Sequence, residues 1–303
     1  MELTVDDQVS VATVAIGSFS QLTLSGPLFL GGVSREEEGD IAEEIFNEEG
    51  FIGCVQEFVV NSKPVSMISA AFSGINVLNC PHPCSDRPCW NGGICQPTGE
   101  EFNCACPLGF RPSDCREKVP LDDTVPMFLG NGYLHYSDPQ VTELLSGRET
   151  YFRVRFRTWR NGLILWVGQQ ENTLNSQFAS LSVESGLVTF RYNLGHGDLV
   201  LIGNSSVIQN GEWHIVEAIR SDQSASIRVD DGPVVIKTSA SQVQSLNPNS
   251  GLYLGGAENV ELQTQGRFRE GFLGCVSEVN LDPSYSVYLM SQADRGQNVD
   301  TCS

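Results

Sequence analysis

Leu252-Tyr253-Leu254-Gly255-Gly256 decides the fold of this chain, because a near copy of it stands earlier, at Leu28-Phe29-Leu30-Gly31-Gly32. A second pair of matching stretches lies downstream of each copy, at Phe51-Ile52-Gly53-Cys54-Val55 and Phe272-Leu273-Gly274-Cys275-Val276. Two matches in the same order indicate an internal repeat of one structural module. The 303-residue chain is therefore expected to hold two related domains.

The two copies differ in how far they extend upstream. The second copy reaches back to about Leu121, whereas Met1 corresponds to a position in the middle of that domain. Half of a β-rich domain has open strand edges and an uncovered apolar face. Residues 1–80 are therefore expected to be the C-terminal half of a truncated domain that does not fold alone. The start MELTVDDQVS carries no signal segment, so the natural start and a signal peptide are expected further upstream.

The second copy is predicted to be all-β. Apolar and arginine side chains alternate along Tyr151–Trp159, which is the period of a strand with one buried face. Leu163–Val167 is a continuous apolar run, typical of a strand that is covered on both faces. Hairpins are predicted at Glu184-Ser185-Gly186 and Asp230-Asp231-Gly232. No helix is expected over residues 125–302, so two packed antiparallel sheets are predicted.

The ten cysteines indicate an oxidising, extracellular compartment. Their number is even, and six of them are crowded between Cys84 and Cys115, as in a disulfide framework. Structural zinc is the competing interpretation. Only Cys104 and Cys106 are close enough to act as a ligand pair, and they lack the usual zinc spacing and a nearby histidine pair. All ten cysteines are therefore expected to form disulfides.

Charge and motifs exclude several classes of function. The net charge of −19 argues against binding nucleic acid, which needs a basic surface. No apolar run is long enough for a transmembrane helix, so membrane insertion is not expected. The chain has no nucleophile-elbow or dinucleotide-binding motif and no cysteine left over for catalysis. An enzyme is not predicted, and the four histidines are dispersed along the sequence: His82, His135, His196 and His214.

The segment between the repeats, residues 81–118, resembles an EGF-like module. The resemblance rests on the cysteine spacing and on Asn91-Gly92-Gly93 and Pro107-Leu108-Gly109-Phe110. Six cysteines alone leave fifteen connectivities open. The resemblance implies one of them: Cys84–Cys95, Cys89–Cys104 and Cys106–Cys115. Calcium is not expected in this module, because Pro81-His82-Pro83 and Pro97 stand where calcium-binding members carry acidic or amide ligands.

The repeats resemble laminin G-like domains of the agrin–perlecan–pikachurin group of matrix proteins. The motifs are the two repeated stretches and Phe190-Arg191-Tyr192-Asn193-Leu194-Gly195. The likeness covers residues 119–303 as a complete domain and residues 1–80 as the rear half of another. It implies antiparallel β-sandwiches of the jelly-roll or concanavalin type, closed by Cys54–Cys80 and Cys275–Cys302. It further implies a secreted protein of the extracellular matrix that binds other matrix proteins and cell-surface glycoprotein receptors such as dystroglycan, or their glycans.

The resemblance also implies a calcium site on the rim of the sandwich. The matching positions are the side chains of Gln177 and Asn247 and the carbonyl groups of Leu194 and Ser245. Calcium prefers six to eight oxygen ligands that include carboxylates, and neither side chain here is charged. The site is therefore expected to be degenerate. In the truncated copy the second side-chain position holds Thr23, which is a poorer ligand.

Two further features of the sequence concern the surface of the protein. Asn204-Ser205-Ser206 is an N-glycosylation sequon, expected to be occupied in a secreted loop. The acidic run over residues 36–49 is interpreted as a solvated loop, with a basic partner or cations as the alternative. Two other functions compete with receptor binding: a calcium-independent spacer or protein-interaction platform, and a carrier that holds an apolar ligand between the sheets.

Overall fold

The computed structural model describes residues 2–3, 5, 11–12, 14, 26–33, 50–61, 63–169, 176–203, 207–240 and 242–302. The chain divides into two compact units, Met1–Cys80 and Pro81–Ser303. Thr23, the acidic run and Asn204 lie outside the described residues.

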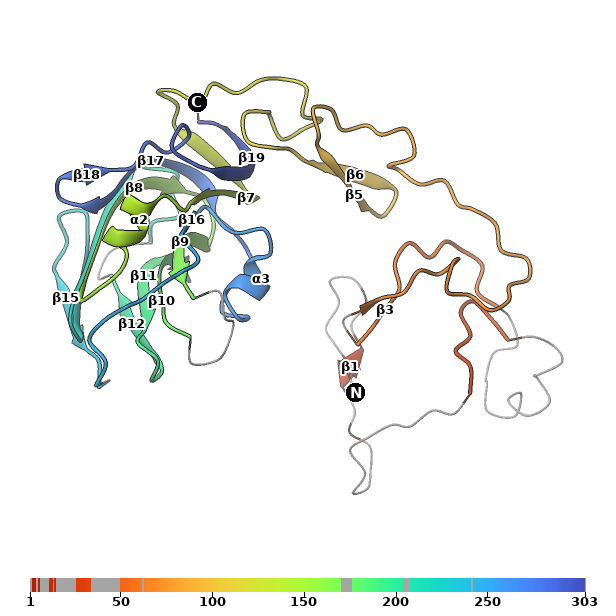
Figure 1. Ribbon diagram of the computed structural model, residues 1–303, viewed down its shortest axis with the longest axis horizontal. Helices are drawn as coiled ribbons and strands as arrows, with labels where there is room; N and C mark the ends of the chain where they lie inside the picture. The colour runs from red at the N-terminus through yellow and green to blue at the C-terminus, as the bar shows by residue number, and fades with distance from the viewer. Residues whose placement is uncertain are drawn as a thin grey trace. The chain divides into compact units, whose positions relative to one another are not determined.

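Thirteen strands and two short helices make up the larger part of the second unit, counted over its described residues (Figure 1). In chain order they are β7 (Pro126–Tyr136), α2 (Pro139–Leu144), β8 (Glu149–Thr158), β9 (Gly162–Gly168), β10 (Phe178–Glu184), β11 (Leu187–Asn193), β12 (Asp198–Ile202), β13 (His214–Ser221), β14 (Ser224–Val229), β15 (Val235–Thr238), β16 (Leu252–Leu254), α3 (Val260–Gln263), β17 (Leu273–Asp282), β18 (Tyr285–Ser286) and β19 (Arg295–Thr301).

The strands form one antiparallel sheet that folds back on itself. Its order is β12-β11-β10-β9-β16-β7-β17-β8-β13-β14-β15, with β18 added to β17 and β19 added to β7. The two end strands approach each other (Figure 1), and Lys237 Nζ of β15 donates to the Val200 carbonyl of β12 at 2.7 Å. The predicted all-β sandwich is confirmed, with its hydrophobic core between the two layers.

The sequence pattern explains which side chains fill that core. Along β8 the apolar Phe152, Val154 and Phe156 are fully buried, while the arginines between them are only partly buried on the outer face. This is the predicted alternation of a strand with one buried face. The hairpin predicted after β10 is also present, with Ser185 and Gly186 at φ 51° and 80°, as a tight two-residue hairpin turn requires.

Strand β9 is covered on both faces, as its apolar sequence predicted. One face belongs to the main core, and the other carries Leu163 and Trp166 in a second apolar cluster with Phe178 and Phe268. The cover on this second face comes from the segment that follows α3. The expectation of no helix was wrong for two short pieces. Asp138 caps α2 and Asn259 caps α3 by accepting a backbone N–H, and such caps stabilise single turns that have no apolar periodicity.

The EGF-like segment forms a two-stranded sheet of β5 (Ile94–Thr98) and β6 (Glu101–Ala105). Its disulfides join Cys84 to Cys95, Cys89 to Cys104 and Cys106 to Cys115, which is the pairing that the resemblance implies. The segment also contacts the sandwich at β19. Leu108 donates its N–H to the Gly296 carbonyl at 3.1 Å, and Arg111 Nε lies 3.2 Å from Asp300 Oδ1.

The described part of the first unit contains four two-residue strands: β1 (Glu2–Leu3), β2 (Val11–Ala12), β3 (Val59–Val60) and β4 (Lys63–Pro64). A disulfide joins Cys54 to Cys80, and Phe51 donates its N–H to the Gly31 carbonyl. Outside β1, none of the residues described in this unit is buried, and Ile52 and Phe72 are almost fully exposed. That residues 1–80 do not fold alone stays a prediction. In the described parts of both units, no helix is long and apolar enough to cross a membrane.

Candidate functional site

The residues expected at the rim come from three neighbouring segments. Gln177 immediately precedes β10 and Leu194 immediately follows β11. The first residue of β10, Phe178, pairs with the last residue of β11, Asn193, so the hairpin brings the two positions together. Asn247 lies in the loop between β15 and β16 and reaches the same rim. Ser245 lies two residues before Asn247 in that loop and is partly buried.

Gln177 connects the other two segments through both ends of its amide. Its Oε1 accepts the backbone N–H of Asn247 at 2.8 Å. Its Nε2 donates to the carbonyl oxygen of Leu194 at 3.4 Å. The orientation of the amide follows from its partners, because a backbone N–H can only donate and a backbone carbonyl can only accept.

A second glutamine reinforces this arrangement. Gln169 Oε1 accepts the backbone N–H of Gln177 at 3.0 Å, and Gln169 Nε2 donates to the Asn247 carbonyl at 3.3 Å. Gln169 follows β9 and was not singled out from the sequence, where a lone glutamine at the end of a strand carries no signal. We call the four residues Gln169, Gln177, Leu194 and Asn247 the rim clasp.

The rim clasp does not fit a calcium ion. A calcium ion needs oxygen atoms turned toward it, but the group that faces the Leu194 carbonyl is the N–H of the Gln177 amide. The charge that normally offsets the dehydration of calcium is missing as well. Within the described residues, no group of three or more His, Cys, Asp and Glu side chains is placed to hold a metal ion.

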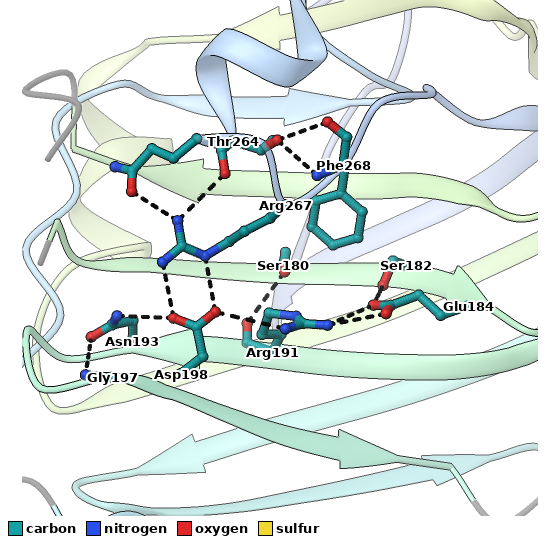
Figure 2. A network of polar contacts seen from close by, with 11 residues as sticks. Ser180, Ser182, Glu184, Arg191, Asn193, Gly197, Asp198, Thr264, Arg267 and Phe268 are labelled. Carbon is teal, nitrogen blue, oxygen red and sulfur yellow. Dashed lines mark hydrogen bonds and ion pairs between the residues drawn. The ribbon is translucent and has the colours of Figure 1, made fainter. Parts of the chain in front are cut away.

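The loop that carries Leu194 is held by the side chain before it, Asn193. Asn193 Oδ1 accepts the N–H groups of Gly195 at 2.7 Å and Gly197 at 3.2 Å. Its Nδ2 donates to Asp198 Oδ1 at 3.0 Å (Figure 2). The Leu194 carbonyl therefore lies in a loop whose backbone is held at Gly195 and Gly197 by one side chain.

Asp198 anchors this loop to the segment that covers β9 and β10. Arg267 contacts both carboxylate oxygens of Asp198, at 2.9 and 3.0 Å, and Arg191 Nη1 lies 3.7 Å away (Figure 2). Burial alone would raise the pKa of Asp198. Its hydrogen bonds and ion pair with Arg267, the Asn193 hydrogen bond and the charge of Arg191 outweigh that effect and lower the pKa below its ordinary value. Asp198 is therefore ionised at neutral pH.

The loop that carries Asn247 is held by a fully buried arginine, Arg220. Its guanidinium donates to the carbonyl groups of Gln244 at 2.9 Å and Gly147 at 2.8 Å. It also donates to Arg148, Thr150 and Asp222. Burial lowers the pKa of Arg220, and the nearby charges of Asp222 and Glu149 offset this effect only in part. Arg220 was not predicted from the sequence, although it alternates in β13 with Val216 and Ala218 on the buried face of the strand.

The comparisons with known proteins agree with this architecture. The model of the laminin G domain matches residues 1–63 and 156–284, and the model of the EGF-like domain matches residues 84–114. The chain belongs to the laminin G domain family. The expected likeness to the matrix proteins of this family is therefore confirmed.

Laminin G relatives share most of the length of this chain. Pikachurin of Rattus norvegicus is 35% identical over 99% of this chain, and pikachurin of Homo sapiens is 34% identical over 99%. The basement membrane-specific heparan sulfate proteoglycan core protein of Mus musculus is 31% identical over 91%. This chain spans 30% of the length of the two pikachurins and 8% of the proteoglycan protein.

A solved laminin G structure supports the fold. The LG1-3 region of the laminin alpha2 chain has a TM-score of 0.52 and 16% sequence identity, over 90% of this chain and 43% of that one. At this identity the likeness concerns the fold alone.

Proposed function

We propose that this chain is a secreted adhesion module of the extracellular matrix, which binds a cell-surface glycoprotein receptor such as dystroglycan, or its glycans, and other matrix proteins. The observation that carries the proposal is the alternation of laminin G and EGF-like modules, shared with the pikachurins over 99% of the chain. The proposed domains are residues 1–80, 81–118 and 119–303. The proposed role is binding and not catalysis, and Asn204 is the proposed glycosylation site.

The test uses the full chain and a dystroglycan ectodomain that carries its native glycans. The same ectodomain after enzymatic removal of its glycans is the matched control. Binding measured by surface plasmon resonance is expected with the glycosylated receptor and is expected to be lost with the deglycosylated one. No binding to either form would refute the proposed receptor.

A calcium-independent spacer or protein-interaction platform is the second candidate, and the contact between the EGF-like module and β19 favours it. Hydrogen bonding at Leu108 and the ion pair at Arg111 give the module a defined position on the sandwich, as a spacer requires. This candidate predicts binding to protein surfaces that is unchanged by removal of receptor glycans and by a calcium chelator. The deglycosylated receptor distinguishes the two candidates, because equal binding to the glycosylated and the deglycosylated form would favour this one and refute glycan recognition.

A further inference from the structure

The two hydrogen bonds of the Gln177 amide have opposite polarity. One end of the amide accepts from the Asn247 backbone and the other end donates to the Leu194 backbone. The two backbone partners belong to different loops, one after β11 and one between β15 and β16. A carbonyl oxygen at a protein rim can be satisfied by a cation, by water or by a hydrogen-bond donor of the protein. At Leu194 the donor is a side chain of the protein itself.

We propose that the Gln177 amide takes the place of a rim cation, so that the rim clasp holds the Leu194 loop to the Asn247 loop without calcium. The Nε2 group of Gln177 directs the positive end of its N–H dipole at the Leu194 carbonyl. The Oε1 atom of the same side chain accepts the Asn247 N–H and so holds the second loop. Gln169 adds two further hydrogen bonds, to the backbone of Gln177 and of Asn247.

The supports behind each loop are consistent with a rim that needs no ion. Asp198 and Asn193 hold the Leu194 loop, and Arg220 holds the Asn247 loop at Gln244. The charge of Asp198 is paired with Arg267, and the guanidinium of Arg220 donates its hydrogen bonds to backbone carbonyl groups. A calcium ion would have to displace a hydrogen bond that the rim already makes.

The variant Gln177→Glu tests the polarity of the rim clasp. The carboxylate that it introduces still accepts from Asn247, but its other oxygen is turned toward the Leu194 carbonyl. Two acceptors then face each other, so we expect Tm of the full chain in EDTA to fall by about 2–4 °C. Calcium is expected to restore part of the loss, because a carboxylate and a carbonyl together attract the ion. Wild-type Tm is expected to be the same in EDTA and in calcium.

Two further variants serve as controls. Gln263→Glu makes the same charge change in α3, where no hydrogen bond of the side chain is found within the described residues, and its Tm is expected to be unchanged. Gln177→Leu removes both ends of the amide. Hydrogen exchange at the Asn247 N–H is expected to stay slow in Gln177→Glu and to become fast in Gln177→Leu.

Two results would overturn the proposal. One is a wild-type Tm that calcium raises while that of Gln177→Leu stays unchanged, because the ion would then bind at the rim clasp. The other is a Tm of Gln177→Glu in EDTA equal to that of wild type. None of these measurements involves a receptor, so they stand or fall independently of the proposed function.

Discussion

Cys106 and Asn298 exchange two hydrogen bonds and so join the EGF-like module to the laminin G sandwich. Asn298 Oδ1 accepts the Cys106 N–H at 2.7 Å, and the Asn298 N–H donates to the Cys106 carbonyl at 2.9 Å. Asn298 is almost fully buried and has φ 52°. Asparagine tolerates this left-handed conformation better than most residues, so both its backbone and its side chain suit the position.

Replacement of Asn298 is therefore expected to loosen this contact. Asn298→Ala leaves the buried Cys106 N–H without an acceptor and places a less tolerant residue at positive φ, which together cost about 2–4 kcal/mol. Asn298→Gly removes the acceptor without the backbone strain, so its loss is expected to be smaller. Urea unfolding of the full chain measures both, and hydrogen exchange at Cys106 reports the contact itself. Unchanged exchange at Cys106 in both variants would contradict this role of Asn298.

Loss of the Arg220 guanidinium is expected to destabilise the sandwich strongly. Arg220→Met leaves several buried carbonyl groups without donors, which we expect to lower the free energy of unfolding by about 3 kcal/mol or more. Arg228→Met on the neighbouring strand β14 is the control. Arg228 is about half exposed and pairs with Glu217 at the surface, so its loss is expected to cost about 0–1 kcal/mol. Equal urea midpoints for the two variants would show that the buried hydrogen bonds of Arg220 contribute little.

Acid is expected to weaken the support of the Leu194 loop through Asp198. The pKa of Asp198 is lower in the folded protein than in the unfolded chain, because its hydrogen bonds and the ion pair with Arg267 outweigh burial. The stabilisation is therefore complete above the unfolded pKa of about 4 and is lost as the pH falls through the folded pKa. The urea midpoint is expected to fall more steeply below about pH 4 in wild type than in Asp198→Asn. Parallel pH profiles of the two proteins would contradict this contribution of Asp198.

The disulfide Cys275–Cys302 is expected to stabilise the complete sandwich. It closes a loop with a sequence separation of 27 residues, and removing such a link costs about 2–4 kcal/mol. The double variant Cys275→Ala/Cys302→Ala is expected to unfold at lower temperature in calorimetry. The matched pair Cys54→Ala/Cys80→Ala removes a link of similar separation, 26 residues, in the other unit. It is expected to leave the main transition in place, and an equal shift in both would argue against independent units.

The sequence by itself determined the modules and the strands. The repeated Leu252–Gly256 stretch, the cysteine spacing and the alternation along β8 are patterns within short segments of the chain. The alternation follows from the two-residue period of a strand with one buried face, and the cysteine spacing is typical of a disulfide framework. The same alternation places Arg220 on the buried face of β13. The sequence does not show which carbonyl groups accept the hydrogen bonds of its guanidinium.

Only the tertiary structure decided what the rim residues do. Gln177, Leu194 and Asn247 were expected together, yet the direction of the Gln177 amide depends on a backbone N–H that lies 70 residues away. The contact between Cys106 and Asn298 spans 192 residues. Whether each end of an amide donates or accepts depends on the groups that the fold brings within about 3 Å of it. The pattern of residues along the chain does not predict which groups those are. The sequence therefore predicted Gln177 and Asn247 as weak calcium ligands, but it did not predict the hydrogen bonds of the rim clasp.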